Sequence, residues 1–517
     1  MILSESRTKN TTRNIFFGLI SRLVEIVFPF INRTILIYTL GAEFTGLSSL
    51  FTSILSILSI AELGFNTAIV YSMFSPIAEN NKNKICELLT LFRKIYLIVG
   101  SVILSLGLLI LPFIPKLVNG DVPLGINIYL IYILYLIDSA ISYFLFSYKE
   151  SLLIAHQRHD ISHIIRTSVI MVRYILQMLI LLIFKDFYLY LGISILGTIG
   201  TNLLISYETS KKYPEYKYIK NIKVKIPEEM KKQVKALLIG NICDRARNSF
   251  DSIILSALFG LTVVAIYNNY YYIYSALYGV MLIMCNSMGA SVGNSIATQT
   301  VEKNYKDLNK FSMIAAWISG WISICMLCIY QPFMELWMGK SLLMSDFNVV
   351  LFCIYFYAIN MNNIRNQYSS GAGIWWEMRN SFIIEAISNI VLNIVLGKFL
   401  GITGIILATI ITIFAFNFIL RTAILFKTYF LGESLSKYLL NHLYWFISVL
   451  IAAIITGFIC KNIVNNNLFI TIILRVIVCC IIPNIIILLM TFKTKTFDEV
   501  KNFLLSNIIN KISIKKV

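Results

Sequence analysis

The sequence predicts an all-α membrane protein with about fourteen transmembrane helices, arranged as two parallel-repeat lobes of six helices followed by two more helices. Composition is the first reason: 58% of the 517 residues are hydrophobic and 14% are charged, whereas soluble domains have roughly 45–50% apolar and about 25% charged residues. The second is the recurrence of continuous apolar segments of about 20 residues, the length that spans a bilayer as a helix. The third is an internal repeat of polar and glycine positions.

Fourteen apolar segments are expected to cross the membrane. Their approximate bounds are 14–39, 44–74, 89–114, 125–148, 164–184, 187–207, 236–259, 263–290, 311–332, 347–368, 380–398, 402–426, 439–460 and 468–491. Most of the 44 Lys and Arg fall in segments that this arrangement places in the cytoplasm. The few lysines expected outside are Lys116, Lys185, Lys340, Lys398 and Lys461. This asymmetry predicts a multi-pass membrane protein with both termini in the cytoplasm.

The same asymmetry accounts for the net charge of +18, so no nucleic-acid partner is expected. The polar, basic first fourteen residues have no small-residue cleavage site beside the first span, so no removable signal peptide is expected either.

Polar and glycine positions recur at a near-constant spacing. An offset of about 219 residues aligns Glu25 with Asp244, Asn32 with Asp251, Gly41 with Gly260, and Pro112 with Pro332. An even number of helices per lobe makes such repeats parallel, and transporters of this kind bind substrate between lobes that rock for alternating access. The expected parts are an N-terminal six-helix lobe (1–208), a C-terminal six-helix lobe (209–430), appended helices (431–492) and a basic amphipathic cytoplasmic tail (493–517).

The first helix of each expected lobe has one polar face. At 100° per residue, one stripe of the span 14–39 holds Arg22, Glu25, Asn32 and Arg33, and one stripe of the span 236–259 holds Asp244, Arg245, Asn248 and Asp251. An ionised side chain at mid-bilayer costs at least about 2.5–3.5 kcal/mol, so these stripes should face a watery cavity or a partner. Arg22 and Glu25 can instead pair within the helix. Arg33 has no acid at that spacing and is the better cavity candidate.

Arginine is suited to a diphosphate because its planar guanidinium is always charged and donates two parallel hydrogen bonds. The expected substrate-binding residues are therefore Arg33, Arg22, Arg173, Arg245, Arg247, Asn32 and Asn248. Arg166 shares a helix face with Arg173, and Gln177 follows one turn later.

Four acids are expected in charge pairing or coupling: Glu25, Glu62, Asp244 and Asp251. They either pair with the arginines in the empty state or carry a coupling proton, and the sequence leaves both roles open. No Walker loop is present, so the expected energy source is H⁺, Na⁺ or the membrane potential. The tyrosine-rich run 267–272 is either a surface for sugar stacking or, by preference, an aromatic belt at the interface.

No cofactor, metal site or catalytic residue is expected. His156, His159 and His163 have a spacing that fits metal binding, but a solvated loop between spans is the favoured interpretation. Cys325 and Cys328 form a C-x-x-C on an apolar helix without a nearby His or acid, which favours packing.

Several segments together resemble a known family. They are Asn32-Arg33, Leu40-Gly41-Ala42-Glu43-Phe44-Thr45-Gly46-Leu47, Leu58-Ser59-Ile60-Ala61-Glu62-Leu63-Gly64 and Tyr71-Ser72-Met73-Phe74-Ser75-Pro76-Ile77-Ala78. Over residues 10–100 the chain resembles bacterial Wzx-type polysaccharide flippases of the multidrug/oligosaccharidyl-lipid/polysaccharide (MOP) exporter superfamily.

The resemblance implies a MATE-like fold with a cationic cavity, in which Arg33 occupies the matching Asn-Arg pair. It implies translocation of undecaprenyl-diphosphate-linked oligosaccharide units from the cytoplasmic to the outer leaflet, for O-antigen, capsule or exopolysaccharide assembly. The implied partners are membrane lipids and a glycan polymerase of the same pathway.

Two alternative functions fit part of the sequence. A multidrug or cation exporter of the same superfamily should have an acidic, aromatic cavity, and the intramembrane arginines count against it. A membrane glycan polymerase needs a sizeable loop or domain for sugar chemistry, and the longest expected external loop, 333–346, is short. The sequence therefore predicts a transporter and not an enzyme.

Overall fold

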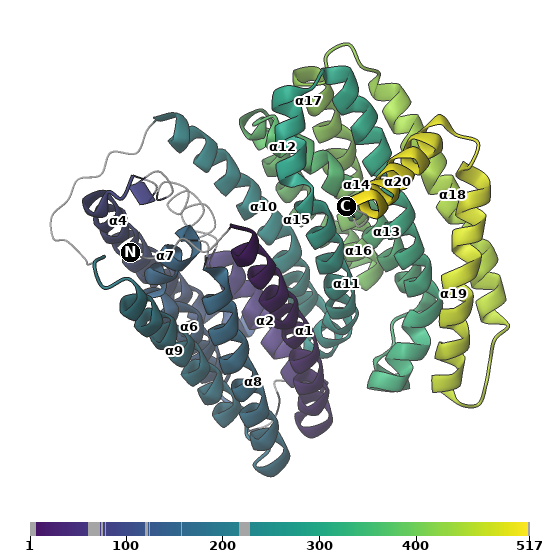
Figure 1. Ribbon diagram of the computed structural model, residues 1–517. Coiled ribbons are helices and arrows are strands. Elements are labelled where there is room, and N and C mark those ends of the chain that lie inside the picture. The colour runs from purple at the N-terminus through teal and green to yellow at the C-terminus, as the bar shows by residue number, and fades with distance from the viewer. Residues whose placement is uncertain are drawn as a thin grey trace. The chain divides into compact units, whose positions relative to one another are not determined.

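The computed structural model describes residues 7–59, 73, 76, 77, 79–118, 123, 125–156, 158–216 and 228–514, with side chains except at 7–20, 22, 228–238, 248, 290, 504 and 506–514. Every regular element in these ranges is a helix (Figure 1). Eleven of the described helices are long and apolar enough to cross a membrane, or twelve if the bent pair Ile128–Phe144 and Ser147–Ala155 forms one span. The predicted all-α, multi-pass membrane class is confirmed.

The total of fourteen spans stays a prediction. The span expected at 44–74 is described as a helix over Ala42–Leu58, and its continuation lies outside the described residues. The span expected at 236–259 is a helix that carries acids and arginines along its membrane part, which lowers its hydropathy.

The chain packs as two compact units, Met1–Asn268 and Asn269–Val517. The helices of the first unit are α1 (Arg7–Leu40), α2 (Ala42–Leu58), α4 (Lys82–Ile110), η2 (Leu111–Phe113), α5 (Ile114–Leu117), α6 (Ile128–Phe144), η3 (Ser147–Lys149), α7 (Glu150–Ala155), α8 (His159–Ile183), α9 (Phe187–Lys212), α10 (Glu228–Phe259) and the first turns of α11 (Leu261–Ser287). Within this unit α1 packs on α8, α8 on α9, α6 on α4 and α9, and α10 on α2. Leu47, Leu50 and Phe51 of α2 lie fully buried at the centre of its core.

The second unit contains the rest of α11 and the remaining helices. They are α12 (Gly289–Thr298), α13 (Val301–Met338), η4 (Lys340–Leu342), α14 (Asp346–Gly371), α15 (Trp375–Leu400), α16 (Ile402–Thr412), η5 (Ile413–Leu420), α17 (Arg421–Thr428), α18 (Leu435–Lys461), α19 (Leu468–Thr491) and α20 (Lys495–Ile514). Helix α13 contacts α14, α18, α19 and α20, and Figure 1 shows α20 lying beside it. Tyr270, from the tyrosine-rich run 267–272, is fully buried in this unit, and its hydroxyl donates a hydrogen bond to Gln331 at 2.6 Å. Its side chain is therefore part of the packed interior.

The aligned glycines of the repeat occupy equivalent turns. Gly41 joins α1 to α2 with φ 107°, and Gly260 joins α10 to α11 with φ 84°. A positive φ is open to glycine without steric cost, so this turn chemistry recurs at both positions. The lobe boundary expected at 208/209 stays a prediction, as do the limits of the appended helices and tail.

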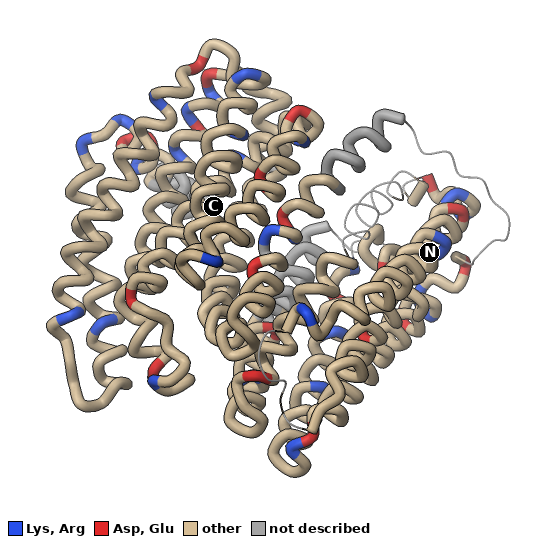
Figure 2. Tube along the Cα trace, turned by 180° about the vertical axis from the view of Figure 1, so that it is seen from behind, with Lys and Arg blue, Asp and Glu red and all other residues tan. Residues whose placement is uncertain are grey.

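Charged residues concentrate at the ends of the helices and are sparse along their middles (Figure 2). This distribution is expected where the middle of each helix faces lipid. The few charged residues within the spans therefore need local partners.

Two buried arginines of the second unit have polar partners within the membrane-spanning helices. Arg421 forms an ion pair with Glu385 and donates from Nε to Ser381 Oγ at 3.1 Å. Arg365, 1% exposed, donates to the side chain of Asn417 at 2.8 Å and to its backbone carbonyl, within the π-helical segment η5. A π-helical turn leaves backbone carbonyls out of the regular pattern, and the Arg365 guanidinium satisfies one of them.

Candidate functional site

A cavity of about 380 Å³ lies within the first unit. Its lining residues come from α4, α6, η3, α7, α8 and α9, and they are Tyr96, Ser142, Ser147, Glu150, Ser151, Arg166, Ile170, Arg173, Thr198, Thr201 and Asn202. The volume falls in the range of about 300–1,000 Å³ found for small-molecule sites. The lining holds two arginines, one carboxylate and several hydroxyl and amide groups, which suits an anionic ligand that also carries hydroxyls.

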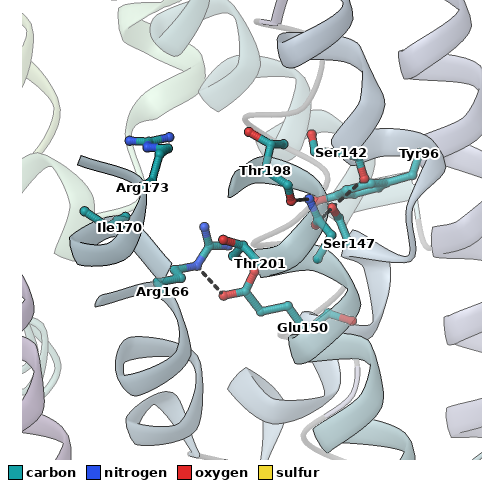
Figure 3. Close-up of a pocket in the computed structure, with 11 residues that line it drawn as sticks. Tyr96, Ser142, Ser147, Glu150, Arg166, Ile170, Arg173, Thr198 and Thr201 are labelled. Carbon is teal, nitrogen blue, oxygen red and sulfur yellow. Dashed lines mark hydrogen bonds and ion pairs between the residues drawn. The ribbon is translucent and has the colours of Figure 1, made fainter. Parts of the chain in front are cut away.

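Helix α8 supplies both cations of the cavity. Arg166 and Arg173 are seven residues apart and therefore lie on one face of the helix. Arg166 points to Glu150 of α7 and donates from Nε to Oε1 at 3.1 Å, with a second bond from its terminal nitrogen to Oε2 (Figure 3). This pair joins α7 to α8 at one side of the cavity.

Arg173 is the cation left available for a ligand. It is half-buried, forms no ion pair with any described carboxylate, and its Nε has no hydrogen-bond partner among the described residues. Its guanidinium carbon lies 4.7 Å from the ring centroid of Tyr174. A buried guanidinium nitrogen without an acceptor is costly, so an anion entering the cavity would gain from this group.

The position of Arg173 depends on a glycine of α9. A Cβ at Gly197 would lie 2.6 Å from Cδ of Arg173 and 3.1 Å from its Cγ. The bare backbone of Gly197 therefore provides the surface on which the stem of Arg173 rests.

Helices α1, α8 and α9 converge at Tyr190. Asn32 donates to the Tyr190 hydroxyl at 2.9 Å and to Gln177 Oε1 at 3.4 Å. Gln177 donates in turn to the Tyr190 carbonyl at 3.1 Å. The guanidinium groups of Arg33 and Arg173 both lie close enough to this hydroxyl to interact with it electrostatically. Three residues expected in the site from sequence, Asn32, Arg33 and Arg173, are thus brought together.

Asp138 of α6 is hydrogen-bonded to two hydroxyl groups of α9. Its carboxylate accepts from Ser194 Oγ at 3.0 Å and from Thr198 Oγ1 at 2.6 Å, both on α9. Thr198 also lines the cavity, so this acid is one hydrogen bond away from it.

The expected residues of α10 form a separate set. Arg247 is 6% exposed and pairs with Asp244 at 3.4 Å, whereas Arg245 is exposed. Asp251 is buried and accepts from the Tyr267 hydroxyl at 2.9 Å. None of these residues lines the cavity described above. A single cavity holding arginines of both sets stays a prediction.

The remaining expected residues are placed as follows. Glu25 is exposed on α1. Glu62 lies outside the described residues, and so do the side chains of Arg22 and Asn248.

The sequence analysis missed the polar residues that complete the cavity. Glu150 and Ser147 lie in the bent segment after α6, and Thr198, Thr201 and Asn202 lie on α9. The second group has a detectable pattern, because polar residues at steps of three and four in an apolar span mark one helix face. The first group has none, since it reaches the cavity only through the bend at Phe146, which has φ 59°.

His156, directly after α7, and His159 and His163, in the first turns of α8, do not form a metal-binding group with described residues. The ring of His156 stacks on Tyr213 with centroids 4.4 Å apart. Burial lowers the pKa of His156 below its usual value, and the neighbouring Glu215 carboxylate opposes this shift. His156 is thus a neutral packing residue at physiological pH.

The chain is similar in sequence to one known protein family and in fold to several solved structures. Residues 11–292 match the family described as "Polysaccharide biosynthesis protein". No curated protein sequence matches the chain.

Among solved structures, the lipid II flippase MurJ in its inward closed conformation aligns with a TM-score of 0.64 at 14% identity, covering 92% of this chain and 98% of that one. A mutant of the Vibrio cholerae MATE transporter VcmN aligns with a TM-score of 0.55 at 14% identity, covering 83% and 99%. A MOP superfamily transporter from Pyrococcus furiosus aligns with a TM-score of 0.55 at 14% identity, covering 81% and 96%. At these identities the likeness establishes the fold, and it confirms the predicted MATE-like architecture. Since the family model covers more than half of the chain, this protein belongs to the polysaccharide biosynthesis protein family and has the fold of the MOP-superfamily flippases and transporters.

Proposed function

We propose that this protein is a flippase that moves undecaprenyl-diphosphate-linked oligosaccharide units from the cytoplasmic to the outer leaflet of a bacterial plasma membrane, for O-antigen, capsule or exopolysaccharide assembly. The proposal depends mainly on one observation. The guanidinium of Arg173 lies in a polar cavity of a membrane-spanning unit and has no carboxylate partner among the described residues. An ionised side chain within the bilayer is unfavourable in free energy. A bound diphosphate would offset this cost through its attraction to the guanidinium.

The cavity residues divide between the two parts of such a substrate. Arg173, with Arg33 near the same tyrosine, would hold the diphosphate through charge-assisted hydrogen bonds. Thr201 and Asn202 would face the sugar hydroxyls, which accept and donate hydrogen bonds. The polyprenyl tail would stay in lipid, as its apolar surface requires.

The Glu150–Arg166 pair offers a route to coupling. In the structure the carboxylate of Glu150 forms an ion pair with the guanidinium of Arg166. A diphosphate that competes for Arg166 would release Glu150, and the released carboxylate would then be available to a coupling ion. Asp138, held by two hydroxyls, is a second acid that H⁺ or Na⁺ could reach. A glycan polymerase of the same pathway would receive the product at the outer leaflet.

The cavity composition argues against a multidrug or cation exporter. Among the described residues its lining contains a single acid, Glu150, which is already paired with Arg166, and a single aromatic residue, Tyr96. A site for hydrophobic cations would need unpaired acids and aromatic faces.

Deletion of the gene tests the proposal. We expect undecaprenyl-diphosphate-linked oligosaccharide to accumulate on the inner leaflet and surface glycan to be lost, because synthesis continues without translocation. Mass spectrometry of extracted lipids, with glycan staining, measures both. Sensitivity to cationic dyes should not change. Normal glycan together with raised dye sensitivity in the deletion strain would favour the exporter instead.

A further inference from the structure

Three buried cysteines from three different helices meet in the second unit. They are Cys328 of α13, Cys460 of α18 and Cys479 of α19, and they are 4%, 1% and 0% exposed. Their Sγ atoms all lie within 4.8 Å of one another, and all three are free thiols. No other group of three metal-binding side chains this close occurs in the described part of the chain.

The surroundings supply both a further sulfur and a positive charge. Cys325 lies one turn before Cys328 on α13, within interaction distance of the Cys479 thiol. Arg475 of α19 donates to the Cys328 carbonyl at 3.0 Å and to the Ile463 carbonyl at 3.2 Å. From this position its guanidinium interacts electrostatically with the thiols of Cys328 and Cys460.

We infer that Cys328, Cys460 and Cys479 bind one Zn²⁺ ion as thiolates, with Cys325 beside the fourth position. Thiolates are the preferred ligands of Zn²⁺ in structural sites, at about 2.3 Å from the metal. Bonds of that length place tetrahedral sulfurs about 3.8 Å apart, so small side-chain rotations from the observed spacing suffice.

The net charge of the three-cysteine site favours a divalent ion over a monovalent one. Three thiolates and Zn²⁺ leave one negative charge, and the guanidinium of Arg475 offsets it. Cu⁺ on the same three thiolates would leave two negative charges for one cation, which is costly where polar groups are poorly solvated. Such an ion would tie the last two spans, α18 and α19, to α13 within the second unit.

Titration of the reduced, full-length protein with Cd²⁺ in detergent tests this inference. Cadmium substitutes for Zn²⁺ and gives an ultraviolet thiolate-to-metal charge-transfer band. We expect one Cd²⁺ per chain, bound in competition with Zn²⁺, and a higher melting temperature with either ion, since binding to the native state alone is stabilising.

Single variants define the ligands. Cys328→Ser, Cys460→Ser or Cys479→Ser should weaken Cd²⁺ binding by more than about 100-fold, because even partners outside the ligand shell contribute about 10–100-fold. Arg475→Met should weaken it by about 10-fold through the lost charge compensation. Cys480→Ser is the matched control, since Cys480 follows Cys479 on the same helix but is exposed; it should bind as the parent does.

Size-exclusion chromatography separates misfolded variants from folded ones that have lost the metal. Absence of a stoichiometric band in the folded, reduced parent protein would overturn the inference. So would exclusive binding of Cu⁺, or an equal loss of binding in Cys480→Ser. None of these measurements depends on transport.

Discussion

Arg173→Ala is expected to abolish surface glycan while the protein reaches the membrane at the parental level. Each charge-assisted hydrogen bond to a phosphate is worth about 1.5–3 kcal/mol. Losing two such bonds should lower the transport rate at limiting substrate by at least about 100-fold. Arg173→Lys should restore only part of it, because an ammonium offers a point charge without the paired donors of a guanidinium. Quantitative glycan blotting, normalised to protein in the membrane fraction, measures the effect.

Two glycines of α9 allow the placement of the Arg173 side chain to be tested while the arginine itself is kept. Gly197→Ala places a methyl group 2.6 Å from Cδ of Arg173, so it should displace the side chain and reduce export. Gly200→Ala is the matched control, because a Cβ there meets no atom within 4 Å.

Arg33→Ala should also abolish export with folding largely intact, with partial rescue by lysine. Normal surface glycan in the Arg173→Ala strain, at the parental level of protein, would show that transport does not require Arg173.

Glu385→Ala should destabilise the second unit by about 3–5 kcal/mol, because it leaves the guanidinium of Arg421 buried without its counter-charge. Glu385 and Arg421 are 2% and 3% exposed, and Arg421 also lies 3.8 Å over the ring of Phe382. Replacing both partners with apolar residues, as in Glu385→Leu with Arg421→Met, should recover most of the loss, since a buried pair often contributes little more than its apolar substitute.

Denaturant unfolding in detergent, applied to the single variants Glu385→Leu and Arg421→Met and to the double variant, gives the coupling free energy of this pair. Glu377→Ala is the matched control on the same helix, because Glu377 is exposed, and it should change stability by less than about 0.5 kcal/mol. Additive effects of the two single variants would show that the pair does not act as a unit.

Most of the fold was predictable because a bilayer restricts a chain to apolar helices of one length range. Gly41 and Gly260 could be aligned by offset alone, and both proved to be turns with positive φ. Helix ends were less accessible. The span expected to stop at 148 bends at Phe146 and continues in helical turns to Ala155.

The candidate site was predictable only where a charge stood out in an apolar span. This signal selected Arg173 and the Asn32-Arg33 pair, and the structure groups them around Tyr190, although only Arg173 of the three lines the cavity. Glu150 was missed because its partner Arg166 is distant in sequence. The cysteine cluster shows the same limit: the C-x-x-C motif was visible, but only tertiary packing brings Cys460 and Cys479 to Cys328.

Reconstitution into proteoliposomes tests the central claim most directly, with a fluorescent undecaprenyl-diphosphate oligosaccharide in the bilayer and a membrane-impermeant quencher outside. The account predicts that the purified protein makes inner-leaflet substrate accessible to the quencher, that Arg173→Ala does not, and that an undecaprenyl oligosaccharide lacking the diphosphate is not moved. Equal movement of the substrate with and without its diphosphate would contradict it.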